Sequence, residues 1–139
     1  MLTTETTQAA VMFLISIGTL AANELKERWT LMRKKKNGTL DLTDQDQSEN
    51  DVATAVNELL AGRTEIEVKR TLELVQRRRK LIFDAQREKL FAEEEFNEGR
   101  INSSQLQLIR ERCDQQIRDK FQEIESDLKG LGLQIEKPR

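Results

Sequence analysis

The sequence predicts an all-α protein. A long N-terminal helix, expected to span a membrane, precedes a short amphipathic helix and a long antiparallel, coiled-coil-like helical hairpin. The single proline stands at position 138, so no earlier residue forbids a long helix. Charged residues make up 35% of the 139 residues, against about 25% in average globular sequence. Capping motifs separate segments whose apolar residues recur at helical spacing.

The missing residue types exclude several kinds of catalytic and metal site. The chain contains no histidine and one cysteine. It therefore lacks a histidine general base and imidazole metal ligands, and one thiol forms neither an internal disulfide nor a thiolate-rich zinc site. No motif arranges the remaining carboxylates, lysines and hydroxyls for catalysis. We therefore expect a protein that is not an enzyme and that uses no cofactor and no metal.

The formal net charge of −2 hides a polarity along the chain. Residues 24–36 carry six basic and two acidic groups, whereas residues 39–62 carry six acidic and no basic groups. The 77 residues that follow are nearly balanced, with 17 basic and 16 acidic groups. We divide the chain into an apolar N-terminal helix with a basic collar (1–36), an acidic linker with a short helix (37–62), a helical hairpin (63–131) and a tail (132–139).

The apolar N-terminal segment is a candidate membrane span. Residues 6–23 are 18 consecutive uncharged residues, which as a helix measure about 27 Å against about 30 Å of bilayer hydrocarbon. The basic collar follows on one side only, which predicts a single span with the C-terminal body in the cytoplasm. Glu5 before the apolar run disfavours a cleaved signal peptide. The residues expected to contact lipid are Phe13, Leu14, Ile15, Ile17, Leu20, Trp29, Arg33, Lys34, Lys35 and Lys36.

Two other interpretations of this segment stay open. Its strictly apolar part, residues 9–22, has 14 residues, a length more typical of a helix buried in a protein core or in an oligomer. Such a chain would be cytoplasmic. A weakly polar stripe that includes Gln8, Ser16 and Asn23 also allows an amphipathic helix lying on a membrane surface.

Helix signals place the boundaries in the first half of the chain. Thr3 or Thr4 can cap a first helix that runs through the collar toward the stop signal at residues 37–38. Residues 39–47 are polar and lack periodicity, which predicts a linker. Ser48 can cap a short amphipathic helix, residues 49–61, that ends at Gly62.

The second half reads as two long helices joined by a well-specified turn. Thr64 with Glu67 forms a capping box, and no breaker follows until Gly99. Asn102 with Gln105 forms the next box, and the last helix runs from residue 103 to 129. Its apolar stripe is Leu106, Ile109, Cys113, Ile117, Phe121, Ile124, Leu128 and Leu131, which we expect to pack on Leu74, Leu81, Ala85, Ala92 and Phe96.

A second stripe of the first hairpin helix lies about 100° away and predicts a second neighbour. We expect this interaction stripe to bind either the 49–61 helix folded back or the same surface of another chain. Its residues are Val68, Leu72, Val75, Ile82 and Leu90.

The remaining charged and reactive groups have ordinary structural interpretations. The basic residues 77–80 fan around a helix and are balanced by nearby carboxylates, so we expect a solvated surface and consider nucleic-acid binding unlikely. Residues 33–36 suit anionic lipid headgroups better, or nucleic acid if the apolar segment is not inserted. Glu93–Glu95 are expected to be solvated, and Cys113 to be a buried thiol.

The turn sequence, residues 94–106, resembles the helical-hairpin turn of the bacterial short C-terminal (SHOCT) oligomerisation domains. The similarity covers 13 residues and consists of Gly99, the apolar Ile101 and the cap at Asn102. Gln105 and Leu106 stand where that family has an acidic and an aromatic residue. The resemblance implies a hairpin that mediates association between chains.

These observations predict a non-enzymatic, membrane-anchored helical protein that mediates self-association or docks a helical partner. The main alternative is a soluble helical adaptor or assembly component whose apolar helix is buried in an oligomer. A lesser alternative is nucleic-acid binding through the basic collar.

Overall fold

The computed structural model describes residues 2–33, 39–42 and 46–137, and it is mostly helical, as predicted. Within these residues the helices are α1 (Thr4–Glu24), α2 (Glu49–Leu59), α3 (Glu65–Asn97) and α4 (Ser103–Lys129). A small sheet, which the sequence did not lead us to expect, is formed by β1 (Thr30–Arg33), β2 (Thr39–Asp41) and β3 (Leu133–Glu136).

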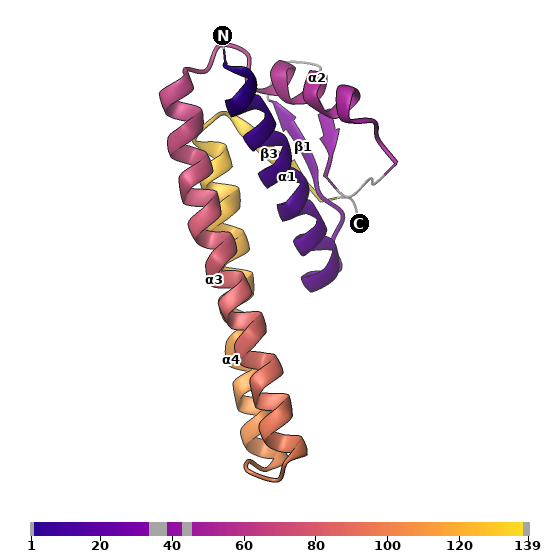
Figure 1. Ribbon diagram of the computed structural model, residues 1–139, viewed down its shortest axis with the longest axis vertical. Coiled ribbons are helices and arrows are strands. Elements are labelled where there is room, and N and C mark those ends of the chain that lie inside the picture. The colour runs from indigo at the N-terminus through magenta and orange to yellow at the C-terminus, as the bar shows by residue number, and fades with distance from the viewer. Residues whose placement is uncertain (1, 34–38, 43–45, 138–139) are drawn as a thin grey trace.

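The molecule has a broad head and a narrow projecting arm (Figure 1). Helices α3 and α4 form one long antiparallel hairpin. At one end of this hairpin α1, α2 and the sheet pack together to form the head, while the other end extends beyond them as two helices alone. Gln86 Nε2 donates to Glu24 Oε1 at 2.5 Å, which marks where α1 ends against α3. We therefore define the arm as residues 87–114 and the head as the rest of the described chain.

Helix α1 ends at Glu24 rather than continuing through the basic collar toward residues 37–38, so that predicted boundary is wrong. Lys26 adopts a positive φ of 56°, and the chain then turns back into β1. The strand forms because β1 pairs with two other segments, and this pairing outweighs the helical pattern of the collar. The predicted stop at residues 37–38 lies outside the described residues.

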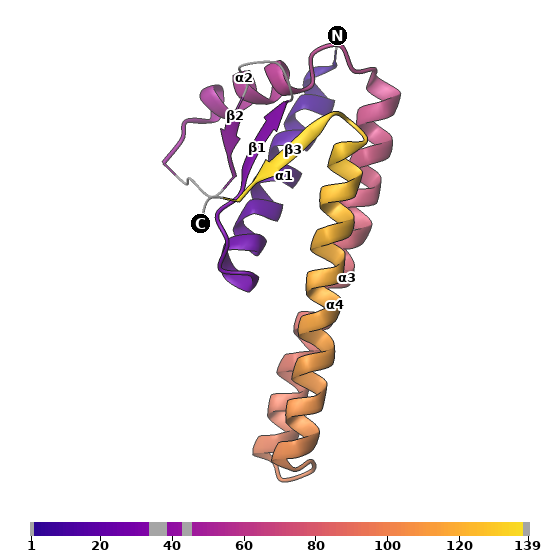
Figure 2. The ribbon, with the colours of Figure 1, turned by 180° about the vertical axis from the view of Figure 1, so that it is seen from behind.

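The sheet has the order β2-β1-β3, with both pairs antiparallel. Figure 2 shows β3 lying beside β1 at the end of α4. The central residue Leu31 is aligned with Leu40 on one side and with Ile135 on the other. The predicted linker and tail therefore each contribute a strand, because their alternating apolar side chains gain burial only when all three segments meet.

The core of the head lies between α1, the sheet and the hairpin. Trp29 is fully buried, and its ring meets Phe121 of α4 edge to face at a centroid distance of 5.5 Å. Gly18 of α1 lies directly on Leu42, since a Cβ atom at position 18 would stand 2.3 Å from the Leu42 carbonyl oxygen. A larger residue at position 18 would push α1 away from the sheet.

The predicted helix caps of the second half are confirmed. Both capping boxes form, Thr64 with Glu67 and Asn102 with Gln105, and Gly99 has the left-handed φ of 76° that ends α3. Helix α2 also begins at its predicted cap, Ser48. The apolar stripe of α4 faces inward as expected, with seven of its residues buried: Leu106, Cys113, Ile117, Phe121, Ile124, Leu128 and Leu131.

The second neighbour of α3 is α1. The two neighbours expected from the sequence are the 49–61 helix and another chain, but α2 packs on α1 and β2. Helix α1 lies along the head end of α3 (Figure 1). Its apolar residues cover the second stripe there because both helices present large aliphatic side chains on these faces.

Candidate interaction surfaces

The residues predicted to contact lipid lie mainly inside the head. Leu14, Ile17, Leu20 and Trp29 are buried, and Phe13 and Ile15 are partly buried against the core. Arg33 donates a hydrogen bond to the backbone carbonyl of Ala61. Lys34, Lys35 and Lys36 lie outside the described residues.

Within the described part of the chain, α1 is the one helix that is long and apolar enough to cross a membrane. Eight of its 21 residues are nevertheless buried against the rest of the fold. Its outer face still exposes Met12, which is 68% accessible. The helix therefore has the composition of a span and the packing of a core helix.

A polar network joins the start of α1 to the start of α3. The Glu65 carboxylate accepts hydrogen bonds from the Thr3 backbone N–H at 3.0 Å and from the Thr3 hydroxyl at 2.8 Å. The Thr6 hydroxyl also donates to it. The hydrogen bond from Thr6 contributes most to lowering the pKa of Glu65 below its ordinary value, and the bonds from Thr3 lower it further. A side chain of α3 thus satisfies donors at the N-terminus of α1.

Only one residue of the predicted interaction stripe is available to another molecule. Val68, Leu72, Val75 and Ile82 are buried within the chain, because α1 and the head cover this part of α3. Leu90 belongs to the same stripe but lies in the arm, beyond the end of α1, and is 62% exposed. The stripe is therefore mostly intramolecular core.

The arm carries large apolar side chains that no other part of the described chain covers. Leu90, Phe91 and Leu108 are 62%, 61% and 67% exposed, and Phe96 is 39% exposed. We call these four residues the arm patch; they are grouped by their position near one end of the hairpin, with Leu90, Phe91 and Phe96 on α3 and Leu108 on α4. Exposed apolar residues of this size are normal when isolated, but a concentration near one end of a molecule is typical of an interaction site.

The two helices of the arm are held by a narrow apolar seam and by ion pairs across it. Ala92, Leu106 and Cys113 are its buried apolar residues. Lys89 Nζ lies 2.6 Å from Asp114 Oδ1, and this hydrogen bond raises the pKa of the lysine. Further pairs join Arg110 to Glu93, at 3.2 Å, and Arg112 to Glu88. The arm therefore places its charges beside the seam and leaves the patch uncovered.

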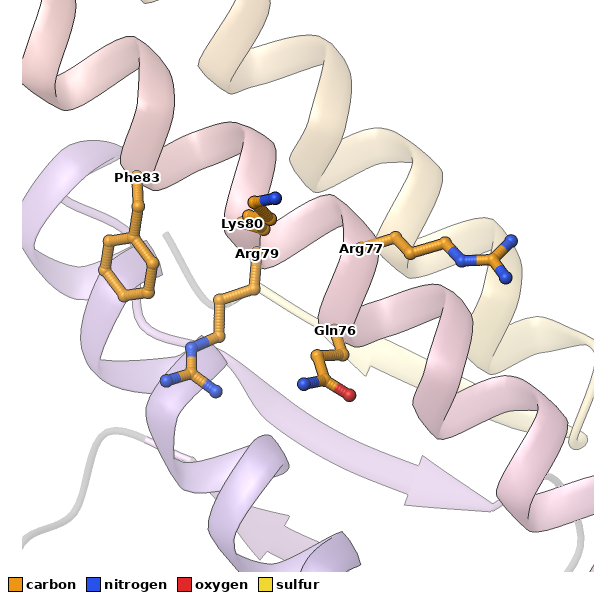
Figure 3. A pocket seen from close by; sticks show the side chains of 5 residues that line it. All are labelled: Gln76, Arg77, Arg79, Lys80 and Phe83. Atoms are coloured by element: carbon orange, nitrogen blue, oxygen red, sulfur yellow. The ribbon is translucent and has the colours of Figure 1, made fainter.

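The basic run at residues 77–80 is divided between two sides of α3. Arg78 points to α4, where its Nε lies 3.5 Å from carboxylate oxygens of Glu123 and Asp127. Burial raises the pKa of Asp127, and Arg78 counteracts that shift. The other three basic residues, with Gln76 and Phe83, line an open hollow of about 320 Å³ (Figure 3). The helical spacing of residues 77–80 predicts a solvated surface, and it does not predict this hollow.

The remaining predicted groups behave largely as ordinary structural residues. Cys113 is buried, and this burial raises the pKa of its thiol, which disfavours the reactive thiolate. Glu93 and Glu95 pair with Arg110 and Arg100 respectively. No cluster of three or more side chains able to hold a metal ion occurs in the part of the chain that the structure describes.

Comparison of the chain with protein-family models, with curated proteins and with solved structures finds no match. The similarity of residues 94–106 to the short C-terminal domains is accounted for by local chemistry, since a left-handed glycine and an asparagine cap are general ways to turn between two helices.

Proposed function

We propose that this chain is a small, non-enzymatic helical protein that self-associates through its arm. The observation that carries the proposal is the arm patch, whose residues Leu90, Phe91 and Leu108 lie on a part of the hairpin that no other described helix or strand covers. Burying a large apolar side chain contributes about 1.5–3 kcal/mol. A second copy of the arm is a surface of suitable chemistry, because it offers the same apolar groups and the same mixture of charges.

The packing of α1 along α3 supports a helix as the occupant of the arm. In the head, α1 packs along the part of α3 that carries the buried Val68, Val75 and Ile82, and the interaction stripe then continues to Leu90, which no other described element covers. A helix from a second chain would extend this packing down the arm. A contact of this kind between identical surfaces closes as a two-fold dimer, and a different helical partner would use the same patch.

For localisation, we propose that α1 is a core helix of a soluble head. Removing α1 into a bilayer would leave the buried faces of α3 and β1 without their cover, and it would break the bonds between Thr3, Thr6 and Glu65. The single span with a cytoplasmic body stays the alternative. Carbonate washing of membranes from expressing cells separates the two, because a soluble head is released without detergent whereas a spanning helix stays in the pellet.

Self-association is tested by sedimentation velocity on the full chain and on the double variant Leu90→Ser/Phe91→Ser. We expect the wild-type protein to form dimers whose dissociation constant rises by about tenfold or more in the double variant, because two apolar anchors are lost. Ile66→Ser is the matched control, since Ile66 is 63% exposed on the same helix but lies in the head. A wild-type protein that stays monomeric, or equal weakening by the control, would contradict the proposal.

A further inference from the structure

The hollow beside Arg79 has the composition of an anion site. Its lining consists of Gln76, Arg77, Arg79, Lys80 and Phe83. Among the described carboxylates, none forms an ion pair with any of the three basic residues. This distinguishes them from Arg78, whose charge is shared with Glu123 and Asp127 on the other side of α3. The hollow thus gathers three basic side chains that form no ion pair within the described residues.

Arg79 is held in place by two aromatic rings. Its guanidinium carbon lies 5.6 Å from the ring centroid of Phe13 on α1 and 5.2 Å from that of Phe83 on α3. Cation–π contacts of this kind hold a guanidinium while leaving its N–H donors free for another partner. The Nε atom of Arg79 is buried and has no hydrogen-bond partner among the described residues. A buried donor without an acceptor costs stability, and an incoming oxyanion would remove that cost.

The neighbouring side chains add donors on the same side. Figure 3 shows Gln76 and Arg79 pointing the same way, toward α1, with Phe83 beside Arg79, whereas Arg77 points away across α4. Lys80 completes the lining from the next position on α3. A second hollow of about 280 Å³ also includes Gln76 and Phe13 in its lining, together with Glu5, Lys69 and Glu73. The carboxylates Glu5 and Glu73 thus line the adjoining hollow and are absent from the lining of the first.

We infer that Gln76, Arg79 and Lys80 form a binding site for a phosphate group. An arginine guanidinium donates two parallel hydrogen bonds to a phosphate, a lysine adds a compact positive charge, and a glutamine amide adds a neutral donor. The hollow is at the small end of the range of about 300–1,000 Å³ that is usual for ligand sites. Its volume accommodates a phosphoryl group and a few further atoms of the molecule that bears this group. This site does not depend on self-association through the arm.

The phosphate could be carried by a soluble molecule or by a lipid headgroup, and the same variants test both sources. Binding to wild-type protein is measured with inorganic phosphate and ATP by calorimetry at constant ionic strength. Sedimentation with phosphatidylcholine vesicles, with and without phosphatidylinositol bisphosphate, measures lipid binding. The resonance of the Arg79 Nε–H group in ¹H–¹⁵N spectra reports the contact directly. Saturable binding of inorganic phosphate or ATP would identify a soluble source. Binding confined to the vesicles that contain phosphatidylinositol bisphosphate would identify a lipid source.

Three substitutions on α3 distinguish a specific phosphate site from non-specific attraction by positive charge. We expect Arg79→Gln and Lys80→Gln each to weaken binding of the successful probe by about tenfold or more, because each removes a charged donor. Arg70→Gln removes the same charge from an exposed position outside the hollow and should leave binding unchanged. Arg79 packs on two rings, so Arg79→Gln can also disturb the fold. Lys80 is exposed, so Lys80→Gln tests the site without removing a packed side chain.

Three results would overturn the inference. The first is the absence of saturable binding of every probe by the wild-type protein. The second is equal weakening by Arg70→Gln, which would indicate diffuse electrostatic attraction. The third is unchanged binding in both Arg79→Gln and Lys80→Gln. The arm variant Leu90→Ser/Phe91→Ser should keep wild-type phosphate affinity, so failure of this inference and failure of the proposed self-association are distinguishable.

Discussion

The same two helices, α3 and α4, lie in two different environments in this molecule. In the head they carry α1 and the sheet, and all of the largest fully buried side chains are found there, among them Trp29, Ile82 and Phe121. In the arm they pack on each other and on no further described element, and the buried apolar residues there are Ala92, Leu106 and Cys113. Half of the large apolar side chains that are exposed in the described residues also belong to the arm: Leu90, Phe91, Phe96 and Leu108.

The difference shows what a third layer contributes to a helical hairpin. Two helices alone bury one stripe each, so an arm of this kind relies on a narrow seam and on charge pairs that are individually weak. A third helix and a sheet allow a second stripe to be buried, which brings large aromatic and aliphatic side chains into the core. The head should therefore supply most of the free energy of unfolding, and the arm should open locally at lower cost.

The largest expected effect comes from removing a large core side chain of the head. Trp29→Ala should lower the free energy of unfolding by about 3–5 kcal/mol, because it deletes a fully buried ring that packs on Phe121. Phe91→Ala, which truncates an exposed ring of the arm, should change it by about 0.5 kcal/mol or less at protein concentrations where the chain is monomeric. Urea unfolding followed by circular dichroism measures both. Equal losses would show that head and arm do not differ as described.

A smaller, pH-dependent effect should be confined to the head. The pKa of Glu65 is lower in the folded chain than its ordinary value of 4.5, so the unfolded chain binds the proton more readily. The stabilisation is therefore present above about pH 4.5 and is lost as the pH falls through the folded-state pKa of Glu65. Glu65→Gln should flatten this part of the stability–pH curve.

Glu94→Gln serves as the control for the pH experiment, because Glu94 is exposed in the arm and makes no ion pair with the other described residues. It should keep the wild-type pH dependence in thermal unfolding measured across the acid range. An identical loss of pH dependence in both variants would show that the contacts of Glu65 with Thr3 and Thr6 are not its cause.

The smallest effect is expected from an ion pair of the arm. A double-mutant cycle of Lys89→Gln and Asp114→Asn should give a coupling free energy of about 0.2–1 kcal/mol that decreases as salt is added, because the pair is partly solvated. Hydrogen exchange of arm amides should report the change more clearly than global unfolding does. A coupling well above this range would show that the arm depends on its ion pairs more than on its seam.

Local sequence signals were sufficient to predict the hairpin. The two capping boxes, the left-handed Gly99 and the spacing of the α4 stripe act over a few residues, and each is found where the sequence placed it. The predicted C-terminal end of α1 is wrong, because the helical pattern continues through the basic collar. Nothing near Glu24 breaks a helix, and the turn at Lys26 is imposed by strands that come from residues 39–41 and 133–136.

The candidate phosphate site was only partly accessible to sequence reasoning. Arg79 and Phe83 are four residues apart, a spacing that brings side chains together on one helix. The second ring, Phe13, comes from a helix 66 positions earlier in the chain, and no local pattern connects it to Arg79. Which residues of the basic run face α4 also depends on how the two hairpin helices are rotated against each other, and there Arg78 pairs with Asp127.

The sequence alone determined where the hairpin helices begin and end, because capping and periodicity are interactions between near neighbours. Only the tertiary structure decided that the apolar N-terminal helix packs in the head, that three short segments form a sheet, and that the arm is left uncovered. These outcomes depend on contacts between distant segments, such as Gly18 with Leu42 and Trp29 with Phe121. Their free energy is gained only when the whole head assembles, so no single segment reveals it.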